Sequence, residues 1–214
     1  MVDDVIAPPR RVPFGPLTVS FDRRVLEPRP WTLLQSEWAA ELAGALPAGP
    51  LCELCAGAGH IGQAAAVLSG RSVVQVEADP VAAGYATANA IDAGVDADVR
   101  ALPLEAALRP GERFWVMLAD PPYLPTAEVG DWPDDPVTAI DGGADGLAVT
   151  RAALAVVDAH LAPGGAALLQ VAGAAQAAQV AGELRRHAGD LVVGEVRAVD
   201  HRRAVVALHH KAPA

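Results

Sequence analysis

The fold of this chain is decided by residues 51–59, which read LCELCAGAG. The first half of this stretch is an apolar run typical of a buried strand, and the apolar residues from Ile61 to Leu68 predict a helix directly after the glycines. A strand that ends in a glycine-rich turn and passes into a helix lets the backbone approach a bulky ligand, with the helix N-terminus directed at it. The stretch therefore predicts a cofactor-binding turn.

The turn alone leaves the identity of the cofactor open. Residues 57–62, GAGHIG, match the G-x-G-x-x-G pattern that receives a dinucleotide pyrophosphate, and such sites place a ribose-binding acid roughly 20 residues further on. Glu77 occupies that place. Because the chain is rich in Ala and Gly, the same pattern also arises by chance. The surrounding residues must decide between a dinucleotide and another cofactor.

Strands and helices alternate along the rest of the chain. We expect a loose arm over residues 1–13, a short hairpin over 17–26 with its turn at 22–24, and a helix after Thr32. Further strands are expected at 51–55, 72–77, 98–102, 114–119 and 166–171, helices at 61–68, 80–93, 146–161 and 175–187, a loop at 120–145, and a closing strand pair at 191–199 and 204–209. The alternation predicts an α/β fold with a mostly parallel sheet of seven strands, to which the closing hairpin adds one antiparallel strand.

Length and composition indicate one large domain. The chain has 214 residues, of which 52% are hydrophobic and only 4% aromatic, so Ala, Val and Leu are expected to form the core. The formal net charge is −10. Broad non-specific binding to nucleic acid depends on clustered Lys and Arg, so this charge argues against it.

Neither a membrane segment nor a metal site is expected. No apolar run approaches the roughly 20 residues that span a bilayer, and residues 1–30 lack a signal-peptide core, which favours a cytoplasmic protein. Cys52 and Cys55 form a C-x-x-C without a second ligand pair. We therefore interpret both as buried small residues rather than as a redox pair or half of a zinc site.

Three motifs resemble those of S-adenosylmethionine-dependent methyltransferases with a Rossmann-like class I fold. The turn at 53–59 resembles their first motif, in which an acid precedes the glycines, and 76–80 (VEADP) resembles the second. Residues 120–123 (DPPY) resemble the fourth motif, which amino-group methyltransferases carry after a strand. The likeness extends over residues 14 to about 173, including VLEPRPWT at 25–32 and AIDGGADGL at 139–147. Together these segments are similar to the release-factor glutamine methyltransferases of the HemK/PrmC type.

The resemblance implies roles for individual residues. Glu77 would accept hydrogen bonds from both ribose hydroxyls, Glu53 would hold the methionine end of the cofactor, and Glu105 would contact adenine. Asp120 and the Pro121 carbonyl would accept hydrogen bonds from the target amine, and Tyr123 would stack over it. The implied cofactor-binding set is Thr32, Glu53, Cys55, Gly57, Gly59, Glu77, Ala78, Glu105 and Asp120, and the implied catalytic set is Asp120, Pro121, Pro122 and Tyr123.

Several departures from the family pattern bear on the substrate. The family usually has Asn at Asp120, Gly at Cys55, Glu at Trp31 and a Glu near Gln170, and its bacterial members carry an N-terminal helical substrate-binding domain. Here we expect residues 1–45 to form an arm, hairpin and helix packed on a methyltransferase domain at 46–214. A release-factor-like protein substrate is favoured, with a partner subunit as a possibility. The alternatives are a nucleic-acid amino group, a small-molecule amine, or cofactor binding without catalysis.

Overall fold

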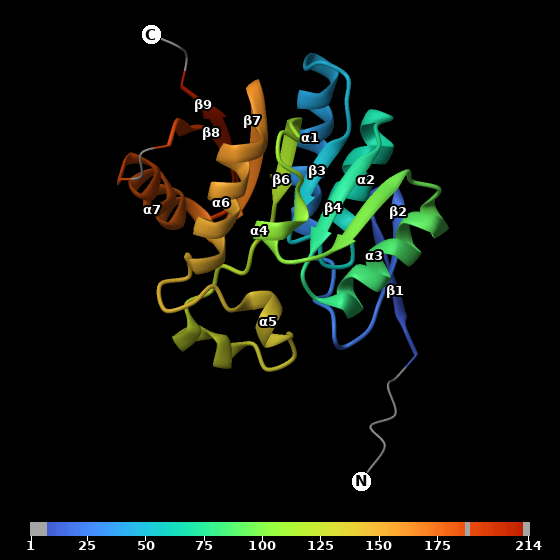
Figure 1. The fold of residues 1–214 in the computed structure, drawn as a ribbon. Helices are drawn as coiled ribbons and strands as arrows, with labels where there is room; N and C mark the ends of the chain where they lie inside the picture. The colour runs from blue at the N-terminus through green and yellow to red at the C-terminus, as the bar shows by residue number, and fades with distance from the viewer. Residues whose placement is uncertain (1–7, 187–188, 212–214) are drawn as a thin grey trace.

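A computed structural model describes residues 8–186 and 189–211 of the chain (Figure 1). Within this part, a seven-stranded sheet lies at the centre. Its strand order is β5 (Ala97–Ala101), β4 (Val73–Glu77), β3 (Leu51–Leu54), β6 (Phe114–Ala119), β7 (Leu161–Val171), β9 (Arg203–His210) and β8 (Leu191–Asp200). The strand order changes direction at β3, which is where ligands bind in sheets of this kind.

The pairing directions confirm the predicted sheet. The pairs β3–β4, β3–β6, β4–β5 and β6–β7 are all parallel. β9 runs antiparallel to both β7 and β8, so the closing hairpin inserts one antiparallel strand. The central strands are apolar throughout, as expected for strands that are covered on both faces.

Two helical layers cover the sheet (Figure 1). One face carries α4 (Leu104–Ala107), α6 (Ala148–His160) and α7 (Gly173–Arg186), and the other carries α1 (Leu33–Ala45), α2 (His60–Ser69) and α3 (Pro80–Ala93). Many of the buried helix residues are alanines, such as Ala64, Ala65 and Ala86, each with no exposed surface. Small side chains let these helices pack closely on the strands, which explains a core with few aromatics.

The predicted N-terminal hairpin was wrong in its position. The structure pairs β1 (Arg10–Phe14) with β2 (Leu17–Phe21), around a turn in which Gly15 has φ +51°. The expected turn at 22–24 instead ends β2, where Val25 N–H donates to the Asp22 carbonyl at 3.0 Å. Residues 10–13 therefore form a strand rather than an arm, because β2 supplies hydrogen-bond partners that their own sequence pattern does not reveal. Residues 1–7 of the expected arm lie outside the described residues.

Smaller differences concern the boundaries. The predicted loop at 120–145 contains two short helices, η2 (Thr126–Asp131) and α5 (Val137–Ile140). A further short helix, η1 (Pro30–Thr32), precedes α1, and β7 begins directly after α6, before Pro163. The predicted end of the last long helix at His187 falls outside the described residues. None of the helices in the described part of the chain is long and apolar enough to cross a bilayer.

Candidate active site

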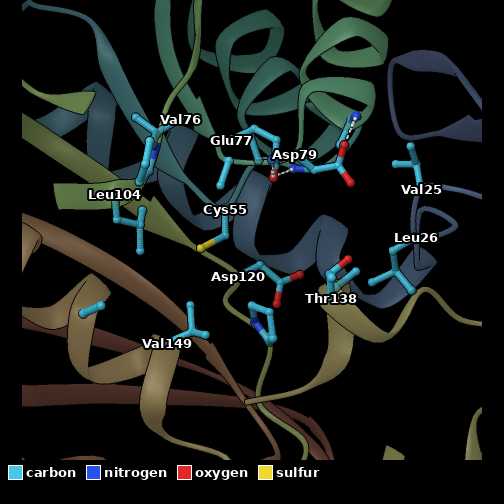
Figure 2. Close-up of a pocket in the computed structure, with 18 of the residues that line it drawn as sticks. Val25, Leu26, Cys55, Val76, Glu77, Asp79, Leu104, Asp120, Thr138 and Val149 are labelled. Atoms are coloured by element: carbon cyan, nitrogen blue, oxygen red, sulfur yellow. Dashed lines mark hydrogen bonds between the residues drawn. The ribbon is translucent and has the colours of Figure 1, made fainter. Parts of the chain in front are cut away.

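A cavity of about 520 Å³ opens at the carboxyl ends of β3, β4 and β6 (Figure 2). This volume falls within the range of small-molecule sites. The walls come from segments that are far apart in sequence: the β3–α2 turn, the end of β4, the residues around α4, the start of the 120–123 segment, α5 and α6. Of the residues assigned from sequence, Cys55, Gly57, Glu77, Ala78, Glu105, Asp120 and Pro122 line it. Thr32, Glu53, Gly59, Pro121 and Tyr123 do not line the cavity.

The turn after β3 is built from left-handed residues. Cys55, Gly57 and Gly59 have φ of +59°, +55° and +83°, and Cys55 is the one non-glycine residue with positive φ in the described parts of the chain. A Cβ added at Gly57 would meet no atom within 4 Å, so open space lies above its backbone. A Cβ at Gly59 would lie 3.1 Å from Cα of Ala86, which explains the need for glycine there. Gly57 therefore offers the close backbone approach that a ligand requires, while Gly59 serves the packing of α2 on α3.

Glu77 connects this turn to the end of β4. Its Oε2 accepts a hydrogen bond from the Gly57 N–H at 2.7 Å, and its Oε1 accepts one from the Asp79 N–H at 2.8 Å. Burial raises the pKa of the Glu77 carboxyl above its usual value, although both N–H donors act in the opposite direction. Each carboxylate oxygen keeps a second lone pair. Glu77 is therefore held rigidly at the cavity wall with acceptor capacity left for a ligand.

Glu53 lies behind the turn instead of in the cavity. It is 1% exposed, its Oε2 accepts from Gln75 Nε2, and its Oε1 has no hydrogen-bond partner. Burial raises the pKa of this carboxyl to about 8. Gly62 makes room for it, because a Cβ at Gly62 would lie 2.4 Å from Oε2 of Glu53. The acid before the glycines thus organises the turn from within the core.

The 120–123 segment continues from β6 toward the cavity. Asp120 N–H donates to the Leu54 carbonyl at 3.4 Å, so the β3–β6 pairing extends to the residue whose carboxyl lines the cavity. Burial raises the pKa of Asp120 to about 7. Figure 2 shows Asp120 and Glu77 on either side of Cys55, with Thr138 of α5 beside Asp120. Two acidic acceptors therefore face one space from different strands.

The glycine-rich segment at 141–146 holds the 120–123 segment in place. Leu124 forms a parallel bridge with Asp141, and the Gly142 N–H donates to the Leu124 carbonyl at 2.8 Å. A Cβ at Gly142 would lie 2.7 Å from the Pro122 carbonyl oxygen, and one at Gly146 would lie 2.5 Å from that of Tyr123. These glycines are required for close backbone contact, which gives a physical role to the Asp-Gly-Gly-x-Asp-Gly pattern.

Tyr123 and Thr32 are not part of the cavity lining. Burial and the charge of Asp120 raise the pKa of the Tyr123 hydroxyl, and the charges of Arg203 and Arg29 lower it. Thr32 is buried, and its hydroxyl donates to the Arg29 carbonyl at 2.8 Å, so it stabilises the η1 turn. Arg203 stacks on the Trp31 ring, with its Cζ 3.6 Å from the ring centroid.

Sequence reasoning missed several cavity residues. His60 lines the cavity, is 9% exposed and packs edge-on against Phe14 at 4.7 Å between ring centroids. Burial lowers the pKa of this imidazole to about 3. Leu104, Thr138 and Val149 come from short helices or helix starts that carry no motif. His60, by contrast, directly follows the glycine turn, so its place in the sequence could have identified it. No group of three or more His, Cys, Asp or Glu side chains suited to a metal ion occurs in the described segments.

Comparison with curated proteins finds relatives that are named release factor glutamine methyltransferases. The chain is 36% identical over 162 residues to the release factor glutamine methyltransferase of Mycolicibacterium smegmatis, covering 71% of this chain and 56% of the relative. The enzyme of the same name from Gloeobacter violaceus is 32% identical over 167 residues, covering 72% and 57%. The chain therefore spans a little over half the length of these relatives. No family model matches the sequence.

Solved structures confirm the fold. The human METTL16 catalytic domain in complex with an RNA hairpin superposes with a TM-score of 0.70 at 16% identity, covering 93% of this chain and 79% of that one. The ribosomal protein L11 methylase of Lactobacillus delbrueckii gives a TM-score of 0.61 at 15% identity, covering 89% and 84%. The fold is that of the Rossmann-like methyltransferases, and the predicted resemblance in sequence to the release factor glutamine methyltransferases is confirmed.

Proposed function

We propose that the protein is an S-adenosylmethionine-dependent methyltransferase whose acceptor is the side-chain amide of a protein glutamine. The observation that carries this proposal is that Glu77 and Asp120 line one cavity, on either side of Cys55 in the turn after β3. Both parts of this arrangement, the acid at the end of β4 and the Asp-Pro-Pro-Tyr segment, would serve the methylation of an amino group. The names of the sequence relatives support the choice of acceptor.

The cavity residues fit the cofactor. The open space above Gly57 suits a bulky ligand, and Glu77 would accept hydrogen bonds from the two ribose hydroxyls. Glu105 and the apolar Leu104 would lie against the adenine. When bound, S-adenosylmethionine supplies a methyl group on a positive sulfonium, whose sulfur leaves as a thioether with the bonding electron pair. The ionised forms of Asp120 and Glu77, which line the cavity, would favour that positive charge.

The acceptor nitrogen is prepared by Asp120 and Pro121. An amide nitrogen is a poor nucleophile because its lone pair is delocalised. The carboxylate of Asp120 and the carbonyl of Pro121 would accept hydrogen bonds from the two N–H groups of the amide. These hydrogen bonds would direct the nitrogen lone pair toward the methyl group. The same two acceptors stabilise the positive charge that develops on nitrogen as the new bond forms. The proton leaves after the transfer, so no prior deprotonation is needed.

The second candidate acceptor is an exocyclic amine of a nucleic-acid base. Asp120 favours it, since an acid often replaces the family's Asn in enzymes of that class. The net charge of −10 favours a protein acceptor, because phosphate contacts need clustered cations. A protein acceptor is therefore the first choice.

Transfer of a tritiated methyl group to release factor, tRNA, rRNA and DNA in parallel tests the proposal. We expect label in release factor, resistant to nuclease, with only a shallow dependence on salt. For a duplex DNA acceptor, log activity would fall against log salt with a slope near −0.9 for each phosphate contact. If nuclease removed the label and the activity showed such a slope, the acceptor would be a nucleic acid and not a protein. No label in any acceptor would refute the proposed activity.

A further inference from the structure

Gln170 is a buried amide without a hydrogen-bond partner. It lies near the end of β7, is 1% exposed, and neither its Oε1 nor its Nε2 has a partner in the described structure. Buried side-chain amides are nearly always paired, so each exception in a folded protein requires an explanation. An apolar residue of the same size would fill this place at a lower cost.

The sheet register places Gln170 beside Asp120. The register of β6 and β7 ends with the pair Ala119–Leu169; Asp120 directly follows β6, and Gln170 is the next residue of β7. Leu118 and Leu168 both pack into the core on the α1 side of the sheet. Side chains two residues apart on a strand face the same side, which places Gln170 on the face of Leu168. The Asp120 N–H still donates to the Leu54 carbonyl at 3.4 Å, so continuation of the strand alternation by one residue would place Asp120 on the same face. Neighbouring strands are about 4.8 Å apart, a distance that a glutamine side chain spans.

A second amide from α1 fixes the same strand ends. Gln35 has no exposed surface, and its Nε2 donates to the Ala119 carbonyl at 3.0 Å and to the Leu168 carbonyl at 2.8 Å. These carbonyls belong to the residue just before Asp120 and to one two residues before Gln170. The Oε1 of Gln35 has no partner. Gln35 therefore has an unused acceptor, and Gln170 unused donors, near the same ends of β6 and β7.

We propose that Gln170 is a positioning residue for Asp120, whose carboxylate accepts a hydrogen bond from Gln170 Nε2 when the acceptor amine enters the cavity. The proposal rests on the proposed methyl transfer. The second hydrogen of Nε2 then goes to Oε1 of Gln35, so the chain Gln35–Gln170–Asp120 leaves one carboxylate oxygen free for the acceptor. Catalytic hydrogen bonds of this kind are often long or poorly aligned in the resting enzyme and tighten in the substrate complex.

The other groups that act with Asp120 are mostly acids or neutral. The charge of Asp120 raises the pKa of Glu53, of Cys55 and of Tyr123. The charge of Glu77 also raises the pKa of Glu53 and of Cys55. The positive charges of Arg29 and Arg203 lower the pKa of Tyr123. Against this background an amide N–H is the donor that would stabilise the ionised form of Asp120. Burial alone raises the pKa of Asp120 to about 7. In the acceptor complex a hydrogen bond from Gln170 Nε2 should lower this pKa, and loss of Gln170 should raise it again toward that value.

The test replaces Gln170 by Met, which keeps the volume and removes the donor. We expect an unfolding temperature equal to or above that of the wild type, because an unpaired amide is lost. We also expect unchanged cofactor affinity, a kcat at least 10-fold lower, and an acid limb of the kcat profile displaced to higher pH. Gln170→Asn, which keeps the amide but is shorter by one methylene, should lose kcat in the same way and serves if the Met variant does not fold.

Carbon-13 NMR titration of the Asp120 carboxyl, with S-adenosylhomocysteine and acceptor added, separates this proposal from the proposed function. A pKa that is higher in Gln170→Met than in the wild type supports the contact even if no acceptor is ever methylated, in which case the proposed function alone fails. An equal pKa in both proteins under conditions where the NMR spectra show the acceptor bound, or an unchanged kcat and pH profile in the Met variant, would overturn the positioning role. Gln170 would then be an unpaired core amide with no part in the reaction.

Discussion

Glu77 is bound to the turn that it serves: its Oε2 accepts the N–H of Gly57 at 2.7 Å, across 20 positions of sequence. The same carboxylate accepts the N–H of Asp79 through its other oxygen. An acid that would contact the cofactor ribose is therefore also the link between the ends of β3 and β4. This double role decides what its removal should do.

Glu77→Ala should weaken binding of S-adenosylhomocysteine by about 1–3 kcal/mol, because hydrogen bonds to a charged acceptor are lost. Isothermal titration calorimetry measures this. Glu128→Ala is the matched control, since Glu128 is an exposed acid of η2 outside the cavity lining, and it should bind like the wild type. Equal affinity of the Glu77 variant and this control would remove Glu77 from the cofactor site.

Asp120→Ala should bind the cofactor and stay folded, while methyl transfer falls by roughly 10²-fold or more. Asp120→Asn should retain activity, because the amide oxygen still accepts a hydrogen bond from the target. Rates of transfer from labelled cofactor to release factor measure both. Unchanged turnover in the Ala variant would show that Asp120 has no part in the chemistry.

The pH dependence of the wild type follows from the raised pKa of Asp120, about 7. Below this value the carboxyl is protonated in the folded protein and is a weaker acceptor, so kcat/KM, which reports groups of the free enzyme, should rise with pH through about 7. The neutral Asn of Asp120→Asn cannot titrate, and that variant should lack this limb. A limb that persists in Asp120→Asn would assign the titration to another group.

Gly62→Ala should destabilise the protein by about 1–3 kcal/mol, because the new Cβ would lie 2.4 Å from Oε2 of the buried Glu53. Gly84→Ala is the matched control. Gly84 is an exposed glycine of α3 with no atom within 4 Å of an added Cβ, so alanine there should stabilise by about 0.5–1 kcal/mol. Urea unfolding of both variants measures the difference. Similar stability in the two would contradict the close packing of Gly62 on Glu53.

Cys55→Gly should stabilise the protein by about 1 kcal/mol, since Cys55 holds a left-handed φ of +59° that costs a non-glycine residue about 1–2 kcal/mol. Cys52 lies in a regular strand with no exposed surface, so Cys52→Gly should destabilise instead. Thermal unfolding of both variants distinguishes them. A loss of stability in Cys55→Gly would mean that contacts of the thiol outweigh the backbone strain.

Local sequence patterns predicted the fold and the ends of the central strands because both depend on features that lie close together in the chain. The apolar run, the glycines and the following helix at 51–68 define the turn at Gly57 without reference to other segments. The same holds for Glu77 and Asp120, which directly follow or end apolar strands. Parallel strands then bring these ends to one edge of the sheet.

The parts that sequence did not predict depend on contacts between distant segments. The strand at 10–14 forms because β2 pairs with it, and its own pattern contains no signal for that partner. Glu53 has the sequence position of a ligand contact, yet the packing of Gly62 and Gln75 buries it behind the turn. Gln170 gains its place beside Asp120 only through the register of β6 and β7.

The most direct test of the central claim is calorimetric titration of the wild-type protein with S-adenosylhomocysteine and, separately, with NAD. The glycine turn at 57–62 is compatible with either nucleotide by its pattern, and only the surrounding acids and the 120–123 segment favour the first. We predict saturable binding of S-adenosylhomocysteine and no measurable binding of NAD. Tight binding of NAD with none of S-adenosylhomocysteine would contradict the assignment of this cavity to methyl transfer.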